Sequence, residues 1–338
     1  MSRAQLLPGC TRGPNAGTHM KKVSTILAVA IGAAFVLVVL LNFLVPWNSP
    51  LKALLTPRKF AYNRLYHNAM ANYQMGEMEV AEPMFAKLLK QKPEDAQLHY
   101  RMGVVKSRLG ETEEAIKQFD KAFDLSGKTM GEAPASVAAI HIQQGEELLK
   151  NDNPRDAGAF FEMANERLDT AYEAVQKREA RERDAVIKEF GLLRGQVYIG
   201  QGLSALLYAD RADVALERFS AAENLFKNAE DIKPFREYRR LAHAYADLAR
   251  VYQKSYMDEA SAKKYWNKSF AVMGMAIESA SVGNKNAVKF GDSFEVFRRK
   301  YRKELKALKN EAEGKDKKQN SAPAPKPEKM ESAIEIFE

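Results

Sequence analysis

The sequence predicts an all-α protein in which one membrane-spanning helix precedes a solenoid of about five helix pairs. Three observations carry this prediction: an uncharged hydrophobic segment near the N-terminus, small and aromatic residues that return every 34 residues, and a polar C-terminal stretch. In chain order we expect a short N-terminal tail over 1–22, a transmembrane helix over 23–47, a juxtamembrane linker over 48–61, a helical repeat domain over 62–310 and a disordered tail over 311–338.

Length and composition allow a sizeable core. The chain has 338 residues, 46% of them hydrophobic, and a net charge of +8 that is spread along its length. Such a modest, dispersed excess is weak evidence for nucleic acid, and we expect no nucleic-acid partner. The single cysteine, Cys10, excludes a disulfide within the chain and a cysteine-based metal site.

The segment Val23–Trp47 carries no charge and is long enough to cross a bilayer. Its 25 residues would span about 37 Å as a helix, more than the ~30 Å hydrocarbon core. Trp47 stands where an interfacial aromatic belongs, and Pro46 and Pro50 end the helix. The alternatives are a buried core helix and a cleavable signal peptide, whose shorter hydrophobic region ends in a small-x-small site that is absent here.

The orientation of this helix is not decided by the flanking charges, which are balanced. Basic residues near its two ends are Arg3, Arg12, Lys21 and Lys22, and Lys52, Arg58, Lys59 and Arg64. Met20 and the two lysines after it resemble a bacterial start, and a very short N-terminus usually stays in the cytoplasm. We therefore expect a single-pass protein of the bacterial inner membrane, with its repeat domain periplasmic rather than cytoplasmic.

Residues 62–95 align without a gap on residues 96–129. The paired positions are Tyr66 and Tyr100, Ala69 and Gly103, Gly76 and Gly110, Ala81 and Ala115, and Phe85 and Phe119. Small residues let two antiparallel helices approach closely, glycine reverses the chain, and the phenylalanine fills the space between one pair and the next. We expect Gly103 and Ala115 to face each other across such a crossing.

This pattern resembles the tetratricopeptide repeat (TPR) family, whose period is 34 residues. Pro93 ends the first copy where the family places its proline, although Pro83 inside the same copy should kink the second helix or delay its start. Later copies are marked by Gly145, Ala157, Phe161 and Ala164, by Gly202, Ala215, Phe219 and Ala222, and by Leu248, Ala249, Tyr252, Ala262, Trp266 and Ser269. We expect Phe85, Phe119, Phe161 and Phe219 to be buried, and the charged stretch Thr170–Phe190 to form one lengthened, solvated helix.

A basic amphipathic helix follows the repeats. Its apolar stripe holds Phe294, Phe297, Tyr301, Leu305 and Leu308, and its other face holds Arg298, Arg299, Lys300, Arg302, Lys303, Lys306 and Lys309 against Glu304 alone. It is either a capping helix with a solvated face or a surface that attracts anionic lipid or an acidic partner. Residues 330–338, which alternate acidic and apolar side chains, are either a short docking motif or a random tail.

Signatures of catalysis are missing from the sequence. It holds no glycine-rich phosphate loop, no G-x-S-x-G elbow and no H-E-x-x-H, and its five histidines have no metal-pair spacing. We predict a protein that is not an enzyme, with no cofactor, no metal site and no small-molecule substrate.

The resemblance implies that partners bind along the concave face, which the first helix of each repeat lines. Carried over position by position, the partner-binding residues are Asn63, Tyr66, Met70, Tyr73, Gln97, Tyr100, Val104 and Arg108. Tyr66 and Tyr100 can equally pack between repeats. The lysine and asparagine clamp with which some TPR domains hold a C-terminal carboxylate is absent, because Tyr66 and Met70 occupy its slots.

Two functions remain open at this stage. The first is a membrane-anchored scaffold that recruits or assembles partner proteins of a membrane-associated complex. The second is a membrane-tethered chaperone or import receptor that handles many clients transiently.

Overall fold

The computed structural model describes residues 57–176, 178–280 and 294–314. The chain divides into two compact units, Met1–Ala71 and Asn72–Glu338. In the first unit the described residues belong to the beginning of α3, and all helices after α3 belong to the second unit.

The described residues are helical apart from the turns between helices, and they contain no β-strand. The helices are α3 (Pro57–Gln74), α4 (Met78–Gln91), α5 (Ala96–Arg108), α6 (Thr112–Leu125), α7 (Glu132–Lys150), α8 (Pro154–Val175), α9 (Ala180–Ala209), α10 (Ala212–Asn228), the 3-10 turn η1 (Glu230–Ile232), α11 (Phe235–Lys254), α12 (Glu259–Ser279) and α13 (Phe294–Ala312). The all-α prediction is confirmed for these residues. α3 begins five residues before the predicted start of the repeats at residue 62.

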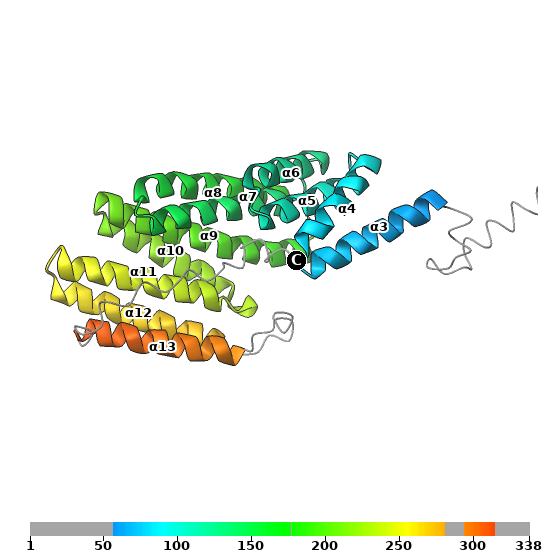
Figure 1. Ribbon diagram of the computed structural model, residues 1–338. Coiled ribbons are helices and arrows are strands. Elements are labelled where there is room, and N and C mark those ends of the chain that lie inside the picture. The colour runs from blue at the N-terminus through cyan, green and yellow to red at the C-terminus, as the bar shows by residue number, and fades with distance from the viewer. Residues whose placement is uncertain (1–56, 177, 281–293, 315–338) are drawn as a thin grey trace, which may run out of the picture. The chain divides into compact units, whose positions relative to one another are not determined.

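Within the second unit, consecutive helices from α5 to α12 pack as four antiparallel pairs, α5 with α6, α7 with α8, α9 with α10 and α11 with α12 (Figure 1). The contacts in the third of these pairs show the direction: Gly202 faces Phe219, whereas Gly195, earlier in α9, faces Phe226, later in α10. The expectation of at least four antiparallel pairs is therefore confirmed.

Aromatic rings lodge against glycines where the helices cross. A Cβ atom on Gly103 would lie 2.7 Å from the ring of Phe119, so the phenylalanine lies directly against this glycine, and the expected approach of Ala115 stays a prediction. The ring of Phe161 lies between two helices, because Cβ atoms on Gly145 of α7 and Gly200 of α9 would come within 2.8 and 2.3 Å of it. The four phenylalanines predicted to be buried have no exposed surface.

The turn between α3 and α4 and the turn within each of the four pairs contain a residue in the left-handed region. These residues are Gly76, Gly110, Asp152, Asp210 and Met257. Glycine adopts this conformation without strain and aspartate tolerates it, whereas an ordinary side chain pays roughly 1–2 kcal/mol. Met257, at φ +52°, is the apolar exception among them.

Helix α7 is buried on all sides along residues 133–142. It contacts α6, α8 and α9, so neighbouring helices cover each of its faces. The small residues Ala133, Ala135, Ala138 and Ala139 allow this close approach.

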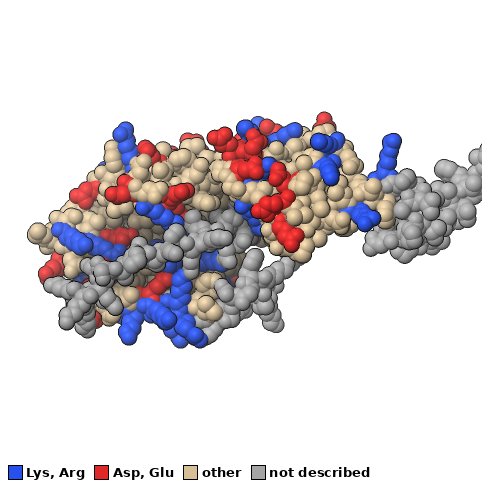
Figure 2. Space-filling view, viewed as in Figure 1, with Lys and Arg blue, Asp and Glu red and all other residues tan. Residues whose placement is uncertain are grey.

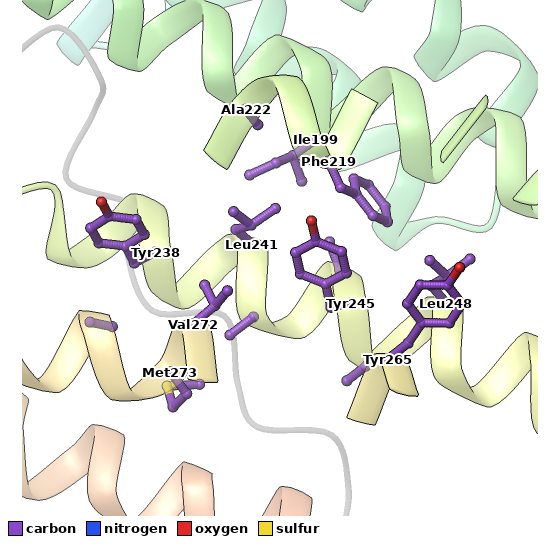
Figure 3. Close-up of a cluster of buried hydrophobic side chains, with 14 of the residues drawn as sticks. Ile199, Phe219, Ala222, Tyr238, Leu241, Tyr245, Leu248, Tyr265, Val272 and Met273 are labelled. Carbon is purple, nitrogen blue, oxygen red and sulfur yellow. The ribbon is translucent and has the colours of Figure 1, made fainter. Parts of the chain in front are cut away.

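A second aromatic core joins α10, α11 and α12 (Figure 3). The ring of Tyr245 meets Phe219 edge to face at 5.6 Å between centroids, and Tyr238 meets Phe226 in the same way at 5.8 Å. From α12, Met273 closes the core on the other side of α11. These rings hold the last helix pair on the one before it.

Helix α13 covers the end of the stack. Tyr301 and Leu308 are buried, and the rings of Phe297 and Tyr301 lie 5.4 and 6.4 Å from the ring of Phe235 in α11. The capping interpretation of this helix is therefore supported for its apolar face.

Two local expectations are wrong. The stretch 170–190 is not one helix, because α8 ends at Val175 and α9 begins at Ala180. Between them Arg178 donates to Glu132 at 2.6 Å and to the Thr129 carbonyl at 3.1 Å, which holds the chain against the start of α7. Of the two effects expected of Pro83, a delayed start of α4 is wrong, because α4 begins five residues earlier at Met78; the kink stays a prediction.

The predicted membrane anchor, residues 23–47, lies outside the described residues. Among the helices that the structure does describe, none combines the length and the apolar character needed to cross a bilayer.

We predict opposite effects of the same substitution at two helical glycines. Gly195→Ala would place a methyl group 2.1 Å from the buried ring of Phe226, and overpacking should lower the free energy of unfolding by about 1–3 kcal/mol. Gly274→Ala, in α12, meets no atom within 4 Å and should raise it by up to about 1 kcal/mol through helix propensity. Urea unfolding of the full chain in detergent, followed by circular dichroism, measures both; equal effects would contradict the glycine contacts.

Candidate protein-binding surface

Three of the residues predicted to bind partners are buried in the helix stack. Tyr73, Tyr100 and Val104 expose 1%, 6% and 0% of their surface. The Tyr73 ring packs on Phe85 at 6.1 Å, and the Tyr100 ring packs on Phe119 at 5.5 Å. Their side chains are therefore part of the core, and we correct their assignment as contact residues.

Tyr100 also contacts the next helix pair. Its hydroxyl lies 3.3 Å from Ser136 Oγ in α7, within hydrogen-bonding distance. This is the packing alternative that the sequence left open for Tyr100. A Tyr100→Ala variant would thus open a cavity between repeats and would test stability rather than binding.

The other predicted residues keep some solvent access. Gln97 is exposed and Arg108 is half-buried, with its guanidinium 5.5 Å from the centre of the Tyr73 ring. Asn63, Tyr66 and Met70 are half-buried residues of the N-terminal unit. The binding role of these five residues stays a prediction.

Polar side chains link the first helices of successive pairs. Arg240 of α11 donates to Glu146 of α7 at 2.7 Å and to Gln196 of α9 at 2.9 Å. Gln196 in turn donates to Glu237 at 3.2 Å. A hydrogen-bonded network therefore joins the first helices of the last three pairs.

Ion pairs also join α11 to α13. Glu304 accepts hydrogen bonds from Arg239 at 2.7 and 3.0 Å and from His243 at 3.1 Å. Burial alone would raise the pKa of Glu304, but the hydrogen bonds from His243 and Arg239 outweigh it and lower the pKa to about 2. Glu311 accepts two bonds of 2.7 Å from Arg250, which lowers its pKa as well.

An exposed apolar patch, which the sequence did not reveal, lies at the turns of the last two pairs. It consists of Leu207, Tyr208, Tyr256 and Met257, exposed by 53%, 61%, 39% and 82%, and is called the turn patch below. Large exposed apolar side chains that gather in one place mark interaction sites more often than isolated ones do.

The turn patch is held in a fixed geometry. The Tyr256 hydroxyl donates to the Asp210 carbonyl at 2.7 Å and lies 2.9 Å from its carboxylate, so the α9–α10 turn is tied to the α11–α12 turn. The centre of the Tyr252 ring lies 5.1 Å from the ring centres of both Tyr256 and Tyr265. The sequence signal for it was Leu207 and Tyr208 before a polar turn, but the contact that completes the patch joins Asp210 to Tyr256, 46 residues later.

Within the described ranges, no three histidine, cysteine, aspartate or glutamate side chains come close enough together to hold a metal ion. The hollows found there are shallow, and one of them is lined by Val296, Arg299, Lys300 and Lys303 of α13.

Protonation of Glu304 should destabilise the fold at low pH. Its pKa is lower in the folded than in the unfolded chain, so the stabilisation is complete above about pH 4.5 and is lost as the pH falls toward 2, by up to about 3 kcal/mol. Glu304→Gln should lose that stability at pH 7 and flatten the acid limb of the stability curve. Urea titrations between pH 2 and 7 measure this, with exposed Glu259→Gln as a control that should keep the parent's pH dependence.

Comparisons with known proteins leave the family open. No protein-family model matches the chain, and no curated protein matches it either. Among solved structures, the chain is similar to MamA, residues 41 to the end, from Desulfovibrio magneticus RS-1, with 17% identity and a TM-score of 0.37 over 62% of this chain and 94% of that one. A superposition of this quality decides neither the family nor the function of the chain.

Proposed function

We propose that this protein is an interaction scaffold that holds partner proteins of a membrane-associated complex. The observation that carries the proposal is the turn patch, where four large apolar side chains stand exposed on a rigid stack of helices. Tyrosine and methionine supply much contact area, and a frame that is already ordered loses little entropy on binding.

Met257 supports a role in binding because it is unfavourable for folding. Its backbone is left-handed, a conformation that glycine or aspartate adopts at the other four turns, and its side chain is 82% exposed. A residue that strains the backbone and leaves an apolar side chain in water contributes little to the stability of the monomer. Backbone strain of this kind concentrates at functional sites, where a side chain is held in position to bind a partner.

The membrane part of the proposal rests on sequence alone. The uncharged segment 23–47 would anchor the scaffold in the bacterial inner membrane, with the repeats in the periplasm. Gln97 and Arg108 of the second unit, and separately Asn63, Tyr66 and Met70 of the first unit, would add further contact residues. Protease added to intact spheroplasts tests the orientation, because only periplasmic repeats would be digested.

The rival function is a membrane-tethered chaperone or import receptor. A scaffold holds a few partners in fixed proportion, whereas a chaperone contacts many clients briefly. Crosslinking in cells, followed by recovery of the full chain and quantification of the bound proteins, separates them. A few partners in stoichiometric amounts support the scaffold, and a broad set of substoichiometric clients supports the chaperone.

We predict that Met257→Gly separates binding from stability. Glycine relieves the left-handed strain, so the variant should be as stable as the parent or more stable by up to about 1 kcal/mol. Combined with Tyr208→Ser, it should nevertheless reduce partner recovery at least tenfold, because the variant lacks half of the patch.

The control is Met163→Ser in α8, which removes an exposed methionine side chain, 43% accessible, from outside the patch. Partner recovery with this control should equal that of the parent. If the double variant also recovers the parent's amount of partner, the turn patch is not the contact surface.

A further inference from the structure

Two acidic side chains of α13 lie between Val296 and Ala312, the part of the helix whose side chains the structure describes. They are Glu304 and Glu311, and both face α11. Arg239 and His243 bind Glu304, and Arg250 binds Glu311. Both carboxylates are therefore neutralised on the inner side of the helix. Neither compensates the positive charge on its outer side.

The outer side carries five exposed cations within eleven residues, Arg299, Arg302, Lys303, Lys306 and Lys309. None of the five pairs with a carboxylate of the described residues. Figure 2 shows lysine and arginine side chains gathered along the part of the surface that α13 and α12 form. We call these five residues the basic surface.

Beside the basic surface lies an apolar contact point. Val296 is 51% exposed and, with Arg299, Lys300 and Lys303, lines a shallow hollow of about 230 Å³. A ligand that fits both features presents negative charge together with apolar side chains.

We propose that the basic surface binds residues 330–338 of the same chain. This segment, MESAIEIFE, holds the glutamates Glu331, Glu335 and Glu338 and the apolar residues Ile334 and Phe337. The glutamates are spaced by four and three residues, and Arg299, Lys303 and Lys306 repeat that spacing on α13. Bound as a helix beside α13, the segment would set three negative charges against three positive ones and bring an apolar side chain to the hollow at Val296.

The connecting chain is long enough for this contact. Residues 315–329 can span up to about 50 Å when extended. The helix from Val296 to Ala312 is about 24 Å long, so every part of the basic surface lies within reach. Because the two partners belong to one chain, even a weak contact would be populated.

Binding of the chain's own segment would control access to the basic surface. An acidic partner or an anionic membrane would have to displace residues 330–338 before it could bind there. The proposal concerns a surface separate from the turn patch and does not depend on the proposed scaffold function.

A cysteine crosslink in the full chain tests the contact. Cys10→Ser removes the natural thiol, and Ala307→Cys on α13 and Ala333→Cys in the segment introduce a pair. We expect efficient intramolecular crosslinking by a short bismaleimide at physiological salt, independent of protein concentration and reduced at high salt. Charge reversal of Glu331, Glu335 and Glu338 to lysine should lower the yield at least fivefold.

Rescue distinguishes a specific contact from chance encounters of a tethered segment. Reversal of Arg299, Lys303 and Lys306 to glutamate should lower the yield equally, and the two reversals together should restore it to within twofold of the parent. The control reverses three exposed lysines elsewhere, Lys87, Lys90 and Lys121, and should leave the yield unchanged.

Two results would overturn the proposal. In the first, reversal of the three glutamates to lysine leaves the crosslinking yield within twofold of the parent's yield. The other is a combined variant that fails to recover although circular dichroism shows the parent's helix content. If the basic surface instead bound phosphatidylserine vesicles equally well with and without residues 330–338, it would be a lipid site.

Discussion

The fit of phenylalanine rings against helical glycines fixes the spacing of the helices on which the rest of the structure depends. Phe161 of α8 touches glycine backbone on both α7 and α9, so one ring sets the distance between helices of two successive pairs. Phe119, Phe219 and Phe226 repeat the arrangement with one glycine each. Because a ring fills each space that a side chain would otherwise occupy, neither partner can change alone without a clash or a cavity.

This dependence explains which parts of the fold could be predicted. The glycines and phenylalanines recur at fixed spacing, so helices, pairs and buried phenylalanines followed from the sequence. The burial of Tyr100 could not be predicted, because a residue at this position of the repeat can face either a groove or the next helix pair. The contact that decides between them is with Ser136, 36 residues later in the next pair. Between α8 and α9, Arg178 bonds to Glu132, and at the turn patch Tyr256 bonds to Asp210. Both contacts join residues far apart in the chain, so no local sequence pattern predicts them.

Charge is distributed so that the two sides of the last helices differ. On the inner side, Arg239, His243 and Arg250 hold the carboxylates of α13, and Arg240 links α7, α9 and α11. These bonds add polar contacts between helices that already pack through their apolar side chains. On the outer side, Arg299, Arg302, Lys303, Lys306 and Lys309 have no carboxylate partner among the residues that the structure describes, which makes that helix both a structural cap and a charged surface.

The complete burial of residues 133–142 in α7 limits how the chain can be divided. An ideal solenoid is modular, and a repeat can be removed at the cost of one interface. Here α7 contacts helices before and after it, so excision of its pair would leave two apolar surfaces that were never shaped to meet. Its amide hydrogens can exchange with water only when neighbouring pairs separate, and their exchange rate therefore reports the cooperativity of the second unit as a whole.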